Sequence, residues 1–329
     1  LNVPDGEDKL DGVQHKYPET VLLFPSAGQA CHAYCTYCFR WAQFIGDSGL
    51  KFAQKEAEHF FLYLEKHEEI TDVLVTGGDP MVMRTKMLQK YLEPFCDSNF
   101  LPHIKTIRFG SRALTFWPKR FTEDEDSHQL LAMFRRLISA GRHVAFMAHI
   151  GHPRELESPI FMKAVKRIQR TGAVIRSQAP LIAGFNDSAD LWAQKWRMEV
   201  NLGIVPYYMF IARDTGAQHY FKVPLSDAAE IYQEAVSNVT GLGRTVRGPS
   251  MSCGPGKVSI DGISEIDGVK VFVMRFLQCR EPELVGRPFF AKFDEHAAWF
   301  DELEPIEGQV LPWNSNGRLK LPSPLLRDE

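Results

Sequence analysis

The strongest constraint on the fold of this chain is a regular alternation of short apolar segments with amphipathic ones. Six apolar, β-branched segments are predicted as strands, at residues 21–25, 72–76, 104–109, 144–149, 173–180 and 204–210. Each is followed by a segment with helical periodicity, at residues 56–65, 85–95, 128–140, 159–170, 189–201 and 226–237. Such alternation predicts a parallel sheet covered by helices. Six units favour an α/β fold of the partial (β/α)6 TIM-like type over a closed eightfold barrel.

Local signals support several of these boundaries. Gly141, Gly172 and Gly203 are predicted to end helices, because glycine adopts the left-handed conformation of a helix C-terminus. Ser226 or Asp227 is predicted to cap the last helix.

The texture of the sequence changes after about residue 240, where glycine and proline become dense. Residues 258–260 and 269–274 predict hairpin strands. The tail from Arg280 is rich in Pro, Phe and Trp and is predicted to be an extended arm. We therefore expect an approach segment at residues 1–20, a barrel at 21–240 and a C-terminal extension at 241–329.

Charge and hydropathy narrow the range of partners. The chain has 38 Lys and Arg against 41 Asp and Glu, a net charge of −3 that argues against a dedicated nucleic-acid binder. It has no apolar run of the roughly 18 residues that would predict a membrane span. No signal-peptide pattern is visible, although a sequence starting at Leu1 says little about targeting. We expect a cytoplasmic protein with no nucleic-acid or membrane partner.

Three of the six cysteines fall within eight residues, directly after the first predicted strand. Cys31, Cys35 and Cys38 have C-x3-C-x2-C spacing, which indicates a local metal site in a reducing compartment rather than a disulfide framework. Thiolates are the ligands of iron–sulfur clusters, and three on a four-iron cluster leave one iron open for chemistry. Structural zinc with His32 as fourth ligand, or clustering by chance, are the alternatives. The position is the one expected for function, because chemistry in parallel barrels lies at the C-terminal strand ends.

The cysteine loop resembles the signature of the radical S-adenosylmethionine enzymes, which use a partial (β/α)6 barrel. Thr76-Gly77-Gly78-Asp79-Pro80, after the second strand, resembles the loop that holds the methionine amino group in these enzymes. The resemblance implies a [4Fe-4S] cluster on Cys31, Cys35 and Cys38. It also implies S-adenosylmethionine beside Gly77, Gly78 and Asp79, where glycine allows close backbone approach and an acid can accept from an ammonium.

Further segments resemble one branch, the lysine 2,3-aminomutase family, in the same order along the chain. They lie at residues 15–19, 39–40, 108–112, 149–153, 177–187, 206–208 and 216–219. Cys253-Gly254-Pro255-Gly256-Lys257 resembles the glycine-rich segment whose lysine holds pyridoxal phosphate as a Schiff base, although Cys253 and Pro255 replace glycines. Lys257 is thus the implied catalytic lysine, and the resemblance covers about three quarters of the chain.

The family assigns further roles by position. It implies that Arg40 binds the substrate carboxylate and that four residues lie beside the cofactors: Lys16, Arg112, His149 and Gln178. Lys16 replaces an arginine there, which keeps the charge but not the fork geometry.

The substrate side chain is where the pattern fails. Lysine-acting members hold the side-chain ammonium with two aspartates, and here Ser250 and either Ala212 or Arg213 replace them, with Asp214 fitting only a different gap. An ammonium buried without a partner would be costly, whereas Arg213 suits a carboxylate. An acidic substrate such as glutamate is therefore favoured, and lysine or a modified lysine stays open.

The resemblance as a whole implies an isomerase, an amino acid 2,3-aminomutase that moves the α-amino group to the β-carbon. Its cofactors would be the cluster, S-adenosylmethionine and pyridoxal 5′-phosphate, with a flavodoxin- or ferredoxin-like reductant. The family's C-terminal zinc cysteines are not matched, so a homo-oligomer stays open. Two alternatives also stay open: a radical enzyme on the same barrel with another reaction or without pyridoxal phosphate, and a non-catalytic iron–sulfur or zinc module.

Overall fold

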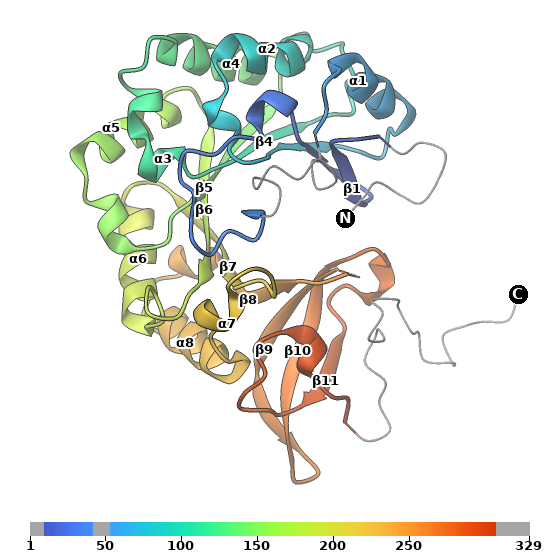
Figure 1. The fold of residues 1–329 in the computed structure, drawn as a ribbon, viewed down its shortest axis with the longest axis vertical. Helices are drawn as coiled ribbons and strands as arrows, with labels where there is room; N and C mark the ends of the chain where they lie inside the picture. Colours follow the sequence, from blue (N-terminus) through green and yellow to red (C-terminus); the bar gives the residue numbers. More distant parts are fainter. Residues whose placement is uncertain (1–9, 42–52, 255, 307–329) are drawn as a thin grey trace, which may run out of the picture. The chain divides into compact units, whose positions relative to one another are not determined.

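The structure is a computed structural model that describes residues 10–41, 53–254 and 256–306. The chain divides into two compact units. The first comprises Leu1–Gln178 and Met198–Pro206, and the second comprises Ala179–Arg197 and Tyr207–Glu329. The two units are described separately below (Figure 1).

The first unit is built on strands that pair in chain order. An antiparallel pair, β1 (Val13–Tyr17) and β2 (Thr20–Leu23), opens the sheet. From β2 onward the neighbours are parallel: β3 (Asp72–Val75), β4 (Thr106–Ser111), β5 (His143–His149) and β6 (Val174–Leu181). The helices are α1 (Ala57–Lys66), α2 (Thr85–Leu92), α3 (Ala113–Phe116), α4 (Ser127–Ser139) and α5 (Pro159–Gln169). In Figure 1, α2 and α4 lie side by side over these strands.

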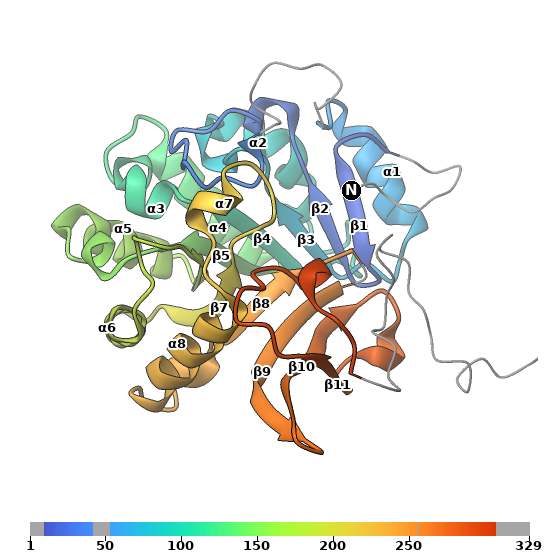
Figure 2. The ribbon, with the colours of Figure 1, turned by 60° about the horizontal axis from the view of Figure 1, so that its bottom comes forward.

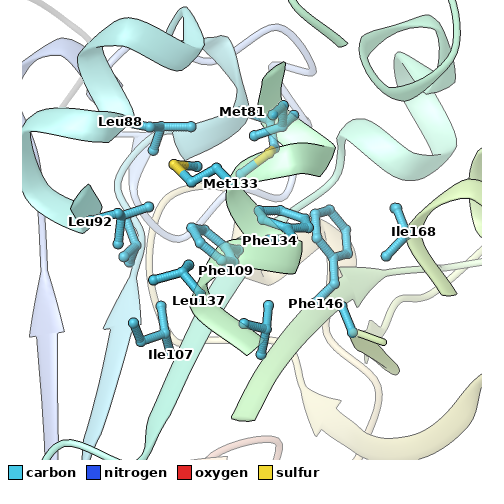
Figure 3. Packing of buried hydrophobic residues seen from close by; sticks show 14 of the residues in the cluster. Met81, Leu88, Leu92, Ile107, Phe109, Met133, Phe134, Leu137, Phe146 and Ile168 are labelled. Carbon is cyan, nitrogen blue, oxygen red and sulfur yellow. The ribbon is translucent and has the colours of Figure 1, made fainter. Parts of the chain in front are cut away.

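The core of the first unit lies between this sheet and its helices. Figure 3 shows Leu88 and Leu92 of α2 facing Met133, Phe134 and Leu137 of α4. The i, i+4 spacing on each helix places these apolar side chains on one face. The strands also contribute apolar side chains to this core. The ring of Phe109 in β4 stacks on that of Phe134 in α4, with 4.9 Å between the ring centroids.

The second unit is dominated by antiparallel strands. Like β6, which passes into the second unit after Gln178, α6 (Ala189–Asn201) and β7 (Val205–Ile211) run from one unit into the other. They are followed by α7 (Gln218–Phe221), α8 (Leu225–Ser237), β8 (Arg247–Ser252), β9 (Gly256–Ile266), β10 (Val269–Cys279) and β11 (Pro288–Lys292). β7 and β8 are parallel, and the pairs from β8 to β11 are antiparallel. Figure 2 shows the long β9–β10 hairpin with β11 beside it.

This architecture confirms the predicted fold class, because the six predicted strands all occur, as β2 to β7, followed by a hairpin-rich extension. The division at residues 20 and 240 stays a prediction. Among the described residues, no helix combines the length and apolar character needed to cross a membrane.

Two details of the prediction were wrong. α2 ends at Leu92, because Pro94 opens a separate 3-10 turn at Glu93–Cys96. α8 begins at Leu225 after Pro224 with no side-chain cap, so neither Ser226 nor Asp227 caps it.

The tail predicted as an extended arm contributes to the second unit between Arg280 and residue 306. There β11 pairs with β10, and Trp299 and Phe300 are buried in the second unit. Residues 307–329 lie outside the described part of the chain.

Candidate functional site

The three clustered cysteines lie on one irregular loop that follows β2 and the short turn Ser26–Gly28. All six cysteines of the chain lie within the described residues and are free thiols. The loop is closed by backbone bonds, from the Cys38 N–H to the Cys35 carbonyl at 2.9 Å and from the Trp41 N–H to the Cys38 carbonyl at 3.1 Å. Burial raises the pKa of the Cys35 and Cys38 thiols. Three half-buried thiols on a short loop fit a soft metal or cluster, which favours the thiolate form on binding.

The Gly77-Gly78-Asp79 segment packs directly against the start of this loop. The Gly78 N–H donates to the Gly28 carbonyl and the Asp79 N–H to the Ala30 carbonyl, both at 3.0 Å. A Cβ on Gly78 would lie 2.3 Å from the Ala30 oxygen, and one on Gly77 would lie 2.6 Å from the Gly28 oxygen. The sequence predicted these glycines for close approach to a ligand. The structure gives a further reason for glycine at both positions. The backbone of this segment is hydrogen-bonded to the segment that leads into the cysteine loop, which leaves no space for a side chain.

Asp79 is a buried junction between three segments, with only 2% of its surface exposed. Its Oδ1 accepts from the Met81 N–H at 2.9 Å and its Oδ2 from the Arg112 N–H at 2.8 Å. His32, inside the cysteine motif, lies with Nδ1 3.8 Å from the same Oδ2. Burial raises the pKa of Asp79 and lowers that of His32. The carboxylate therefore orders the backbone on which the predicted site depends.

Arg112 contacts the cysteine motif itself. Its Nη1 donates to Cys35 Sγ and to the Tyr37 hydroxyl, both at 2.7 Å, and its Nη2 lies 3.3 Å from Glu155 Oε1. The guanidinium also lies 3.8 Å from the ring centroid of Phe116. Burial raises the pKa of Tyr37 to about 12, so this hydroxyl stays protonated. Arg112 was predicted beside the cofactors, but its bond to Cys35 and the roles of Tyr37 and Glu155 were not predicted.

The other predicted cofactor residues of the first unit lie at neighbouring strand ends. His149 ends β5, is paired in register with Gln178 of β6, and has its ring centroid 6.2 Å from that of Tyr37. Arg40 follows the last cysteine, with its guanidinium 4.6 Å from the ring centroid of Phe24. The backbone of Lys16 belongs to β1, but its side chain lies outside what the structure describes. The cysteine motif, the Gly77-Gly78-Asp79 segment and Arg112 thus lie in contact at the C-terminal ends of the parallel strands, and the Tyr37 ring lies beside both Arg112 and His149.

Lys257 lies in the second unit, near the start of β9. Its Nζ is 3.9 Å from the ring centroid of Tyr208 and 5.4 Å from that of Phe210, and these two rings stack at 5.0 Å. The Arg247 guanidinium lies 4.4 Å from the Tyr208 centroid. The lysine amine is therefore held against an aromatic surface of β7 by cation–π contact. Tyr208 belongs to the Pro-Tyr-Tyr motif noted in the sequence, but its contact with Lys257 was not predicted.

The segment before Lys257 is positioned by strand pairing. The Cys253 N–H donates to the Gly256 carbonyl at 2.8 Å, and a Cβ on Gly256 would lie 2.2 Å from the Gln278 oxygen. Glycine is therefore required at Gly256 by the approach of β10. Pro255 lies outside the described residues.

The residues predicted to replace the family's aspartates, Ser250 and either Ala212 or Arg213, differ in exposure, and Ala212 is buried. Ser250 is fully buried, and its hydroxyl donates to the Met209 carbonyl at 3.4 Å. Arg213 follows β7 and is half-buried, while Asp214 beside it is exposed.

Comparison with known proteins gives two kinds of similarity. No family model matches the sequence. A protein from Aquifex aeolicus, whose name gives L-lysine 2,3-aminomutase as a provisional assignment, is 31% identical over 294 residues, covering 89% of this chain and 75% of that protein. The L-lysine 2,3-aminomutase of Bacillus subtilis is 25% identical over 237 residues, and the match spans 72% of this chain but only 47% of the relative. Among solved structures, a radical SAM methyltransferase from Sphaerobacter thermophilus matches 71% of this chain and 68% of its own, with a TM-score of 0.48 and 13% identity.

Proposed function

Because the chain belongs to the lysine 2,3-aminomutase family, we propose that it is a radical S-adenosylmethionine enzyme that moves an amino acid's α-amino group to the β-carbon. The observation that carries the proposal is the arrangement around the cysteine loop. Three free thiols, the Gly77–Gly78 backbone and the Arg112 guanidinium meet at the C-terminal strand ends. We also propose that a protein of the flavodoxin or ferredoxin type reduces the cluster.

The cysteine loop fits a [4Fe-4S] cluster with an open iron. Cys31, Cys35 and Cys38 would hold it, and the Gly77-Gly78-Asp79 segment would hold S-adenosylmethionine beside it. When bound, the two groups supply a carbon radical that removes hydrogen from the substrate. Arg112 would orient Cys35 and keep a positive charge beside the sulfurs, and the aromatic rings of Tyr37 and Phe116 would help to exclude water.

Lys257 would hold pyridoxal phosphate, which supplies an electrophilic carbonyl for the migrating nitrogen. The described residues fit this role in two respects. The amine lies against Tyr208 and Phe210, and β9 and β10 fix the backbone at Gly256. Arg247, on the same ring, would add positive charge suited to a phosphorylated cofactor.

The substrate we propose has an acidic side chain, with glutamate as the first candidate. Ser250 offers a neutral, buried hydroxyl that is bonded to the backbone, so it provides no anionic partner for an ammonium. Arg213 is the cation that would pair with a side-chain carboxylate, and Arg40 would bind the α-carboxylate.

Borohydride trapping tests the role of Lys257 directly. Protein loaded with pyridoxal phosphate and reduced should carry one added pyridoxyl group on the peptide containing Lys257, as measured by mass spectrometry. Lys257→Ala should lose that label and the visible band of the bound cofactor. Lys270→Ala is the matched control, because Lys270 also lies on an aromatic ring, 3.7 Å from the Phe293 centroid, in the same unit.

Three outcomes would count against the proposal. Labelling of Lys270 instead of Lys257, or no labelling at all, would exclude the proposed role of pyridoxal phosphate at Lys257. Either result would favour another radical reaction on the same barrel. Zinc without sulfide in anaerobically purified protein would favour a metal-binding module instead.

A further inference from the structure

A second group of potential metal ligands lies at the other end of the first unit's parallel strands from the cysteine loop. His15 belongs to β1, while His67 and Glu69 lie in the turn between α1 and β3. The Thr71 N–H donates to the Glu19 carbonyl at 3.0 Å, which ties this turn to the β1–β2 connection. The group therefore lies where the parallel strands begin, whereas the cysteine loop follows the end of β2. The function proposed above assigns no role to these three side chains.

The three residues approach each other closely enough to share one ion. One donor atom from each of His15, His67 and Glu69 lies within 4.8 Å of the others. The two imidazole centroids are 5.6 Å apart, and the ring of Tyr63 packs against that of His67 at 4.2 Å. The rings are thus held in place by packing from α1.

Hydrogen-bond contacts show which nitrogen of each ring can reach a shared ion. His15 Nε2 lies 2.9 Å from the Pro18 carbonyl, which can only accept, so Nδ1 of the neutral ring is an acceptor and takes the Tyr63 hydroxyl at 2.9 Å. His67 Nδ1 lies 2.9 Å from Glu69 Oε1, so one ion can bind both atoms in place of the hydrogen between them. His15, whose other ring nitrogen donates to a carbonyl, is in the usual state of a metal-ligating histidine.

We propose that His15, His67 and Glu69 form a binding site for Zn²⁺. Two imidazoles and one carboxylate match the preferences of zinc, and a water would take the remaining position, because the Glu69 side chain is 50% exposed. Binding requires His15 Nδ1 to exchange the Tyr63 hydroxyl for the ion, and His67 Nδ1 to exchange its hydrogen bond to Glu69 for the ion, with the ring proton moving to Nε2. The ion would join β1 to the turn before β3, and positions at this end of a parallel barrel usually serve stability.

Zinc binding to the full chain, with its iron–sulfur cluster reconstituted, tests the proposal. Equilibrium dialysis with metal analysis should find one zinc per chain while the iron content stays constant. His15→Gln and His67→Gln should each weaken binding at least tenfold, and Glu69→Gln should weaken it measurably. Glu68→Gln and His59→Gln are matched controls, because both residues are exposed neighbours outside the group, and they should bind zinc as the wild type does.

X-ray absorption at the zinc edge keeps the test decisive where a histidine variant fails to fold. The site predicts nitrogen and oxygen ligands without sulfur, and Tyr63→Phe should bind zinc at least as tightly, since it removes the competitor for His15. Sulfur ligands would place the ion on the cysteine loop and overturn the proposal. Equal binding by wild type and His67→Gln, or no binding by the wild type, would overturn it as well.

Discussion

At the scale of single residues, Arg112 shows that the candidate site includes contacts that the cysteine motif alone does not reveal. The cysteine spacing predicted a metal site from eight consecutive residues, but the partner of Cys35 lies 77 positions away in sequence. Arg112 also holds Tyr37 and Glu155, so one buried cation connects three segments. No local pattern predicts such a contact, because it depends on how β4 and the cysteine loop pack.

Removing Arg112 should lower the reduction potential of the bound cluster. A positive hydrogen-bond donor on a ligand sulfur stabilises the more negative, reduced state, so Arg112→Gln should make reduction harder. The measurement is a redox titration monitored by electron paramagnetic resonance on reconstituted protein. Arg154→Gln is the control, because Arg154 is an exposed arginine next to Glu155 in sequence, and it should leave the reduction potential unchanged. A variant with full iron content and an unaltered potential would show that Arg112 does not act on the cluster.

At the scale of elements, the predicted loop after β3 is held by close backbone contacts. Gly78→Ala would place a methyl group 2.3 Å from the Ala30 oxygen, so one of the two loops must move. We expect a loss of about 1–3 kcal/mol in the free energy of unfolding, together with reduced iron incorporation.

Thermal unfolding and iron analysis measure both effects of Gly78→Ala. Gly241→Ala is the control, since nothing lies within 4 Å of its Cβ position. Normal iron content in Gly78→Ala would mean that the loops can separate without harm to the cysteine site.

A buried ionic network supports the segment that follows Asp79. Arg120 is 1% exposed and donates to the Met81 carbonyl at 2.9 Å and to the Met83 carbonyl at 3.1 Å. Asp126 pairs with Arg120 at 2.6 Å and accepts from the Thr85 N–H at 2.6 Å. Partial burial of Asp126 would raise its pKa, but the bonds from Thr85 and the charge of Arg120 outweigh it and lower the pKa.

This network predicts a specific dependence of stability on pH. Because the folded pKa of Asp126 lies below its unfolded value, its contribution is complete above about pH 4 and is lost as pH falls through the folded pKa. Asp126→Asn should cost roughly 1–3 kcal/mol at neutral pH, since it leaves a buried donor of Arg120 poorly satisfied.

Urea unfolding over a range of pH measures this contribution. The difference between wild type and Asp126→Asn should shrink as the solution becomes acidic, while the exposed Glu125→Gln should behave as the wild type. A constant difference at every pH would exclude the charge of Asp126 as the cause.

Most elements were predictable, because amphipathic periodicity is local. α6 has the bounds that its pattern predicts, at Ala189–Asn201. β8 was missed because Arg247–Ser252 contains Gly and Pro and has no apolar alternation, and its extended form depends on pairing with β9. β11 begins at Pro288 and likewise depends on its partner, β10.

At the scale of the whole molecule, the chain combines a parallel, helix-covered unit with an antiparallel one. The cysteine loop belongs to the first unit and Lys257 to the second. The two units are not consecutive blocks of sequence, because β6, α6 and β7 each run from one unit to the other. Composition varies along the chain and changes near residue 240, whereas the two units interleave segments of sequence, which composition alone cannot indicate.

The central claim joins the two predicted centres in one reaction on an amino acid, and one measurement tests it most directly. Reconstituted protein with pyridoxal phosphate, S-adenosylmethionine and a reductant is incubated with glutamate, aspartate, lysine or alanine, and 5′-deoxyadenosine and β-amino acid are quantified. The account predicts that deoxyadenosine formation depends on the amino acid, is greatest with glutamate, and is accompanied by the β-isomer. Greatest activity with lysine would contradict the proposed substrate. Deoxyadenosine formation that is independent of both the amino acid and pyridoxal phosphate would contradict the central claim.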